Sequence, residues 1–206
     1  MYLVKTPWWL RKLYGANLTW KIATERDEIF LTFDDGPHPE ATPFVLNCLR
    51  QFNAKATFFC IGKNVQQYPE IYKQIIDEGH KTGNHTYNHL NGWKTNDATY
   101  LKNVMFTQKY VDSTLFRPPY GRISRFQANQ LKPVFDIIMW DVLSGDFDTA
   151  LTPQKCLENV TGYTVPGSII VFHDSQKAFK RLEYALPKAI EFFAGKGYAM
   201  KTIESK

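Results

Sequence analysis

Residues 29–37 read IFLTFDDGP, five mostly apolar residues followed by two acids, a glycine and a proline. An apolar run this short, closed by turn residues, is typical of a strand that is buried on both faces. Comparable runs recur at residues 56–61, 81–84, 115–118, 134–143, 168–173 and 198–203. The sequence therefore predicts seven short strands.

Helix-like segments lie between these runs. They cover residues 42–52, 68–78, 96–113, 124–131, 152–162 and 180–194. Strands that alternate with helices in this way indicate parallel βα units. Two architectures fit the alternation, a closed or nearly closed barrel and an open, doubly wound sheet.

The positions of the polar residues favour the barrel. Side chains suited to chemistry stand at the carboxyl ends of the first, third, fourth, fifth and sixth predicted strands. An open sheet concentrates its site at one switch point, whereas a barrel brings all its strand ends around one mouth. We therefore expect an α/β fold, an irregular (β/α) barrel of about seven parallel strands.

Composition indicates an ordinary globular chain. Of 206 residues, 44% are hydrophobic and 22% are charged, and no run of 18 apolar residues could span a membrane. We expect a single domain over residues 1–206, with its core at about 27–203 and residues 1–26 packed on the barrel. We also expect a monomer.

The net charge of +5 comes from scattered basic residues, so no nucleic-acid-binding stripe is predicted. The three cysteines include no CxxC pair, which argues against a disulfide framework. The first 22 residues lack the apolar core of a signal peptide, so the compartment stays unassigned, with the cytoplasm as the default. Peripheral membrane contact through Trp8 and Trp9 is an alternative to packing of this segment.

The first candidate site is Asp34-Asp35 at the end of the first strand. Adjacent carboxylates raise each other's pKa, and a bound cation removes that cost. One acid can then bind the metal ion while the other acts on water. An Asp-Gly turn with a helix-capping acid explains this motif equally well when it is taken alone.

His85 and His89 are the second candidates. Histidines four residues apart share one face of a helical turn, so both can reach one ion. Surface helices often contain such pairs, but this one follows the third strand on the rim that carries Asp35. Two histidines and one carboxylate leave coordination positions open, which is typical of a catalytic metal site.

Two further stretches complete the rim. In FRPPYG, residues 116–121, two prolines and a glycine make a rigid turn that can aim Arg117 inward and present the backbone N–H of Tyr120. In VFHD, residues 171–174, His173 can serve as a general acid. An ordinary surface loop and a structural histidine are the alternatives.

Five motifs in this order, TFDDGP, HTYNH, RPPYG, WDVLSGDFD and VFHD, resemble the polysaccharide deacetylases of carbohydrate esterase family four, which share the NodB homology domain. The resemblance covers about residues 27–203 and implies a distorted TIM-like barrel. It also implies removal of N-acetyl or O-acetyl groups from chitin, chitooligosaccharides, peptidoglycan or xylan.

The resemblance further implies a role for each candidate. Asp35, His85 and His89 match the ligands of one divalent metal ion, for which Zn²⁺ is the first choice and Co²⁺ or Ni²⁺ are alternatives. Asp34 matches the general base and Arg117 the arginine that orients it. The Tyr120 N–H matches an oxyanion donor, and His173 matches the general acid.

The fourth motif departs from the family pattern W-x-V-D-S/T-x-D-W. Leu143 stands where the family has an aspartate that partners the catalytic histidine, and Phe147 replaces a tryptophan. Side chains two apart on a strand share a face, so Asp141 is predicted to take over as the partner of His173.

The leading hypothesis is a metal-dependent hydrolase that deacetylates an N-acetylated glycan, with Trp93 as a candidate for stacking on a sugar. An amidase for a non-sugar substrate is the second hypothesis. A catalytically weak, glycan-binding relative is the third, although a binder has no need of a free carboxylate such as Asp34 beside the metal ion.

Overall fold

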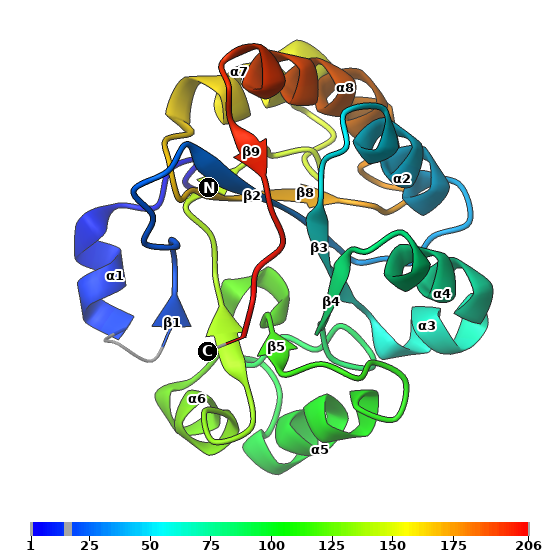
Figure 1. Ribbon diagram of the computed structural model, residues 1–206. Coiled ribbons are helices and arrows are strands. Elements are labelled where there is room, and N and C mark those ends of the chain that lie inside the picture. Colours follow the sequence, from blue (N-terminus) through cyan, green and yellow to red (C-terminus); the bar gives the residue numbers. More distant parts are fainter. Residues whose placement is uncertain (1, 15–17, 206) are drawn as a thin grey trace.

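The computed structural model describes residues 2–14 and 18–205. Figure 1 looks into a ring of strands with helices around its outside. The ladder runs in the order β1-β6-β5-β4-β3-β2-β8-β7, and β9 pairs separately with β2. All these pairs are parallel. The irregular α/β barrel predicted from the sequence is therefore confirmed.

The strands follow the predicted apolar runs closely. They are β1 (Leu18–Thr19), β2 (Glu28–Asp34), β3 (Ala56–Cys60), β4 (Lys81–Asn84), β5 (Leu115–Phe116), β6 (Asp136–Ile138), β7 (Val142–Leu143), β8 (Ile169–His173) and β9 (Ala199–Met200). The first of these, β1, was not predicted, because its two residues carry no readable alternation and depend on pairing with β6.

The six predicted helices are present, and α1 and α3 are two that were not predicted. They are α1 (Trp8–Tyr14), α2 (Ala41–Gln51), α3 (Gly62–Gln67), α4 (Pro69–Asp77), α5 (Asp97–Thr107), α6 (Arg125–Leu131), α7 (Pro153–Tyr163) and α8 (Phe179–Gly195). Side chains of Asn96, Ser124 and Thr152 accept backbone N–H bonds at the starts of α5, α6 and α7, which fixes where these helices begin.

Alternation along β2 determines which residues face the barrel interior. Leu31 and Phe33 belong to the core under α2 and α8, whereas Phe30 belongs to the cluster inside the barrel. Residues two apart share a face, so Thr32 and Asp34 point inward with Phe30. Asp34 is thus the last inward-facing residue of its strand, at the carboxyl rim.

The predicted strand at residues 134–143 is two strands. Its first part, β6, pairs with β5 and β1, and its second part, β7, pairs with β8 on the other side of the barrel. Residues 139–141 between them are outside any strand. This seam is where the barrel is irregular, and the N-terminal residues fill it.

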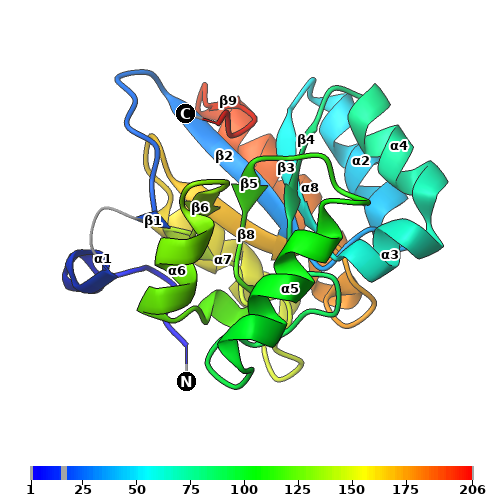
Figure 2. The same cartoon turned by 90° about the horizontal axis from the view of Figure 1, so that it is seen from below.

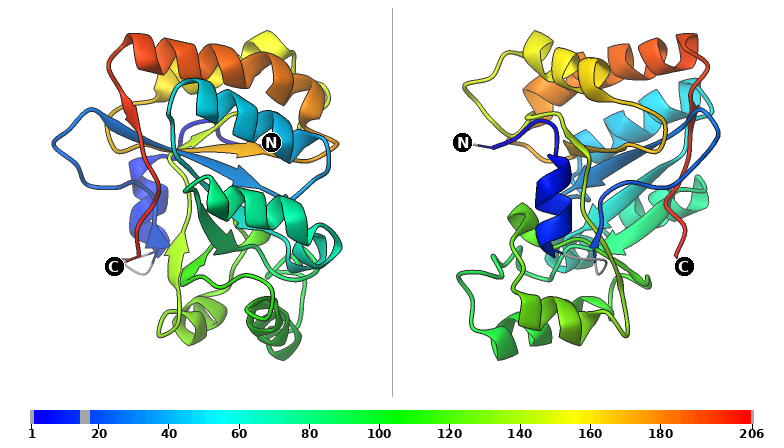
Figure 3. Two further views of the ribbon diagram at one scale, coloured as in Figure 1. Left: turned by 45° about the vertical axis from the view of Figure 1, so that its right-hand side comes forward. Right: turned by 90° about the vertical axis from the view of Figure 1, so that its left-hand side faces the viewer.

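The N-terminal strap, residues 2–12, lies across the seam. Val4 accepts a hydrogen bond from the Leu143 N–H at 2.8 Å, and Thr6 donates its N–H to the Asp141 carbonyl at 2.9 Å. Figure 3 shows α1 beside the strands in the right-hand panel, and in Figure 2 it lies on the opposite side of the barrel from α4. The described part of residues 1–26 therefore contacts the barrel.

Asp141 is the anchor of this strap. Its carboxylate is fully buried and accepts hydrogen bonds from Lys5 at 2.6 Å, from Arg11, and from the Ser168 hydroxyl at 2.6 Å. A buried carboxylate requires such partners, since burial of an unpaired charge is costly.

Trp8 and Trp9 are 68% and 49% exposed, so the strap does not bury them, and membrane contact through them stays a prediction. None of the described helices combines the length and apolarity needed to cross a membrane.

Replacing Asp141 should destabilise the protein. Asp141→Asn leaves Lys5 and Arg11 beside a neutral amide, and breaking a buried ion pair costs ~3–5 kcal/mol. Because the two cationic side chains are 33% and 27% exposed, we expect a smaller loss, of about 2–3 kcal/mol in the free energy of unfolding. Urea unfolding measures it. Asp77→Asn, which removes an exposed pair with Lys73, is the matched control and should be nearly neutral.

Candidate active site

A cavity of about 670 Å³ opens at the carboxyl ends of the strands. This is the end at which (β/α) barrels place their active sites. Its lining includes nearly all the residues singled out in the sequence, namely Asp34, Asp35, His85, His89, Tyr120 and His173. Arg117 lies beneath it, fully buried, and Asp141 is not part of it.

The loop after β2 is fastened to the end of β8. Gly36 donates its N–H to the Asp174 carboxylate at 3.1 Å, and the Thr42 hydroxyl binds the same carboxylate. A Cβ on residue 36 would fall 2.1 Å from Asp174 Oδ2, so only glycine fits there. Asp35 adopts a left-handed backbone, with φ of 78°, which turns its side chain away from the interior and into the cavity.

Asp174 is fully buried, and that burial raises its pKa to about 8. It is therefore mostly protonated at neutral pH. Sequence reasoning did not assign this residue a role, although it ends the VFHD motif. Its contacts give it a structural one, because it holds the turn that carries Asp35.

His85 and His89 are brought together by a loop, which corrects the helical turn expected for them. Residues 85–90 after β4 form no helix, and His89 has a φ of 55°. Spacing of four residues still places the rings close, with centroids 5.1 Å apart. Left-handed conformations of residues other than glycine are costly, and here they occur at Asp35, Thr86, His89 and Tyr120.

The donor atoms of Asp35, His85 and His89 fit a divalent metal ion. All lie within 4.8 Å of one another. The Asp35 Oδ1 atom is buried and has no hydrogen-bond partner among the described residues, although His85 Nε2 and His89 Nε2 lie 3.6 and 3.1 Å from it. A buried carboxylate oxygen in this state needs a cation, and one carboxylate with two imidazoles suits Zn²⁺.

The protonation of His85 suits a metal ligand. Its Nδ1 lies 2.8 Å from the carbonyl oxygen of Arg117, which can only accept, so Nδ1 carries the proton and Nε2 keeps its lone pair. Burial lowers the pKa of His85 to about 4, which keeps the ring neutral. For Asp35, burial raises the pKa, but the contact with His89 and the positive charge of His173 outweigh it and hold the pKa below its usual value.

Arg117 and Asp34 form an ion pair inside the barrel. The Arg117 guanidinium donates to Asp34 Oδ1 and to the Thr32 hydroxyl, both at 2.7 Å. It also donates to the carbonyls of Ile138 and Met139 and lies over the Phe59 ring. These bonds fix the direction of the Asp34 carboxylate, which also lines the cavity.

The turn after β5 presents Tyr120 at the cavity edge. Gly121 and Arg122 donate their N–H groups to the carbonyls of Pro118 and Pro119, which closes the turn. Tyr120 has a φ of 60°, and its ring lies 4.6 Å from that of His89. The ring of Tyr120 therefore lies beside the candidate metal site, and the role of its backbone N–H stays a prediction.

The partner of His173 is Asp146. Nδ1 of His173 donates to Asp146 Oδ1 at 2.7 Å, and the backbone N–H of His173 donates to Oδ2 at 2.8 Å. Burial lowers the pKa of His173, but the charge and hydrogen bond of Asp146 outweigh it and raise that pKa to about 9. The prediction that Asp141 is the partner is wrong.

Two observations explain this error. The alternation argument needs positions 141 and 143 to lie on one continuous strand. Asp141 lies in the gap between β6 and β7, outside either strand. Gly145, with a φ of 79°, then turns the chain back so that Asp146 reaches His173. The glycine directly before this acid was the available signal. Leu143 lines the cavity without a polar contact to offer.

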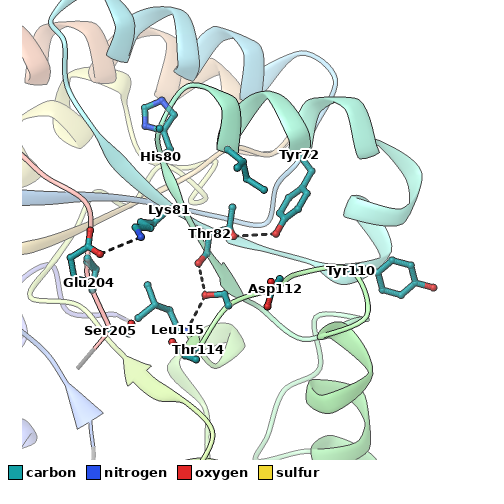
Figure 4. Close-up of a pocket in the computed structure, with 14 residues that line it drawn as sticks. Tyr72, His80, Lys81, Thr82, Tyr110, Asp112, Thr114, Leu115, Glu204 and Ser205 are labelled. Atoms are coloured by element: carbon teal, nitrogen blue, oxygen red, sulfur yellow. Dashed lines mark hydrogen bonds and ion pairs between the residues drawn. The ribbon is translucent and has the colours of Figure 1, made fainter.

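A second cavity, of about 680 Å³, lies at the amino ends of β4 and β5. Figure 4 shows it lined by Lys81, whose ammonium pairs with Glu204 at 3.3 Å, and by Tyr72, which contacts Thr82. Because it is at the opposite end of the barrel from His85 and Asp34, it is no part of the candidate active site.

The family model for polysaccharide deacetylase matches residues 21–132. This chain belongs to the polysaccharide deacetylase family. A peptidoglycan-N-acetylglucosamine deacetylase of Bacillus cereus is 38% identical over 86% of this chain and 67% of its own length. A second one from the same organism is 34% identical over 90% of this chain and 91% of its own length.

The fold agrees with this family. A crystal structure of a peptidoglycan N-acetylglucosamine deacetylase, in complex with 4-naphthalen-1-yl-N-oxidanyl-benzamide, superimposes with a TM-score of 0.88 at 33% identity. The superposition covers 96% of this chain and 95% of that one. The barrel described above is thus the fold of a known deacetylase.

Metal binding can be tested directly. We expect chelator-treated protein to bind one Zn²⁺ per chain in calorimetry, because three converging donors form one site. His89→Ala should weaken binding by about 100-fold or more, since even residues outside the ligand set cost ~10–100-fold. His38→Ala removes a histidine outside the cavity and should leave binding intact. Equal affinity in the His89 and His38 variants would contradict the site.

Proposed function

We propose that this polysaccharide deacetylase removes N-acetyl groups from amino sugars of a polysaccharide or oligosaccharide. The observation that carries the proposal is that one cavity holds the Asp35, His85 and His89 cluster together with a paired carboxylate, Asp34, and a paired histidine, His173. Asp34 and His173 are register partners on the neighbouring strands β2 and β8. A base and an acid therefore flank the same small volume.

Asp35, His85 and His89 would hold one divalent ion, with Zn²⁺ as the first choice. When bound, such an ion supplies Lewis acidity at the acetyl carbonyl. Asp34, held by Arg117, takes a proton from the attacking water. Charge that develops on the carbonyl oxygen meets the backbone N–H of Tyr120, a preorganised donor.

His173 completes the reaction. An amine leaves poorly unless its nitrogen is protonated, and His173 Nε2 supplies that proton because Nδ1 is held by Asp146. The raised pKa keeps His173 protonated at neutral pH. This arrangement favours a hydrolase over a glycan-binding protein, since binding alone does not require a base and an acid in the same cavity.

Aromatic residues at the cavity suit a sugar. Trp93 is 52% exposed, its Nε1 donates to the Ile123 carbonyl, and the Arg122 guanidinium lies 4.1 Å above its ring. Its position is thus fixed, although it is at the surface. Peptidoglycan containing N-acetylglucosamine is the first substrate to test, because two similar proteins of Bacillus cereus are named for that activity.

The proposal predicts acetate release from peptidoglycan or from N-acetylglucosamine oligomers, and its loss on chelation. Asp34→Asn should lower kcat by ~10²–10⁴, because it removes the general base. Acetate is measured enzymatically, and Zn²⁺ binding by the variant shows that the site is otherwise intact. Release from simple non-sugar amides but from no glycan would instead favour an amidase.

Asp146 and Asp141 should differ in their effect on pH dependence. The general acid must be protonated, so activity falls as pH rises through the pKa of His173. Asp146→Asn removes the charge that raises this pKa, and the alkaline limb of the kcat profile should move to lower pH. Asp141→Asn should leave the limb in place. A shift in the Asp141 variant alone would reverse the assignment of the partner.

A further inference from the structure

Tyr2 is a wall residue of the catalytic cavity, although it lies far along the sequence from every motif. Its ring centroid is 5.0 Å from that of Phe147, and its hydroxyl donates to Asp148 Oδ2 at 3.0 Å. Phe147 in turn packs edge-on against His173, with centroids 5.2 Å apart. Tyr2 and Phe147 therefore form the side of the cavity next to the general acid.

The N-terminal strap holds Tyr2 there. Its next residues are hydrogen-bonded across the seam at Val4 and Thr6, and Lys5 and Arg11 bind the buried Asp141. Asp141 thus fastens the segment that carries Tyr2. Residue 2 lies outside the stretch matched by the family model, residues 21–132, so the model assigns no role to it.

The cavity has aromatic side chains on both sides of the candidate metal site. Trp93 and Tyr120 stand on the side of His89, and Tyr2 and Phe147 stand on the side of His173. The C–H groups on a sugar-ring face are weakly positive and pack against the negative face of an aromatic ring. A linear glycan across the site would meet aromatic rings at both ends.

We propose that Tyr2 is a sugar-contacting residue, which forms a subsite on the His173 side for the sugar next to the one that is deacetylated. This inference rests on the proposed function. The competing explanation is that Tyr2 only supports the loop that carries Asp146, since its hydroxyl also lies close to Gly145. The two explanations differ in what loss of the ring does to binding and to turnover.

The test compares Tyr2→Ala with the wild type on the tetramer and the dimer of N-acetylglucosamine. Loss of one aromatic contact should raise KM for the tetramer about threefold to tenfold. The KM for the dimer should rise less, because the dimer spans fewer subsites, and kcat should change less than KM on both. Tyr2→Phe keeps the ring and should recover the tetramer KM. Trp8→Ala changes an exposed ring of the same strap that does not line the cavity, and serves as the matched control.

Binding separates this inference from the proposed function. Calorimetric titration of the tetramer into Asp34→Asn protein, with and without Tyr2→Ala, measures the contact without turnover. Weaker binding in the double variant supports the subsite. Unchanged binding, or an equal fall in kcat on both oligomers with KM unchanged, overturns it. If the tetramer binds but no glycan loses acetate, the proposed function fails and the subsite stands; if the tetramer does not bind at all, both fail.

Discussion

The ion pair between Arg117 and Asp34 is the constraint around which the barrel interior is built. Two charges buried this deeply are stable only when their remaining polar atoms are also satisfied. Arg117 meets this requirement with Thr32 and Asp34 on β2 and with the carbonyls of Ile138 and Met139 across the barrel. The pair therefore connects opposite sides of the barrel. The same hydrogen bonds fix the orientation of the Asp34 carboxylate, the proposed base.

Charge balance around this pair points to the metal ion. Asp34 is matched by Arg117, and Asp146 by His173. Asp174 needs no partner charge at neutral pH because burial raises its pKa to about 8. Asp35 is left facing His85, which burial keeps neutral, so a cation supplied from outside the chain completes the balance. The same reasoning explains why Asp35 Oδ1 has no hydrogen-bond donor among the described residues.

Much of the fold could be predicted from the sequence, because buried parallel strands are short apolar runs and most of their polar ends meet at one rim. The two errors at the site came from assumed local geometry. His85 and His89 meet through a loop with left-handed residues, where a helical turn was expected. Asp146 takes the place predicted for Asp141 as the partner of His173, because Asp141 lies between β6 and β7 and the chain turns at Gly145. For the strap, the sequence predicted only that it packs on the barrel. Its hydrogen-bond partners could not be predicted, because they lie at residues 140–143, far away in sequence.

The seam also has a consequence for the order in which the protein forms. Contacts distant in sequence are made late, because a long loop must close before they contribute. Lys5 and Asp141 are separated by 136 positions, and Tyr2 and Asp148 by 146. During synthesis, the strap residues leave the ribosome before their partners and must wait for more than 130 further residues to be made before they can pair. The strand pairs that carry the metal ligands, β2 with β3 and β3 with β4, span a much shorter stretch, so the acid side of the cavity is completed after them.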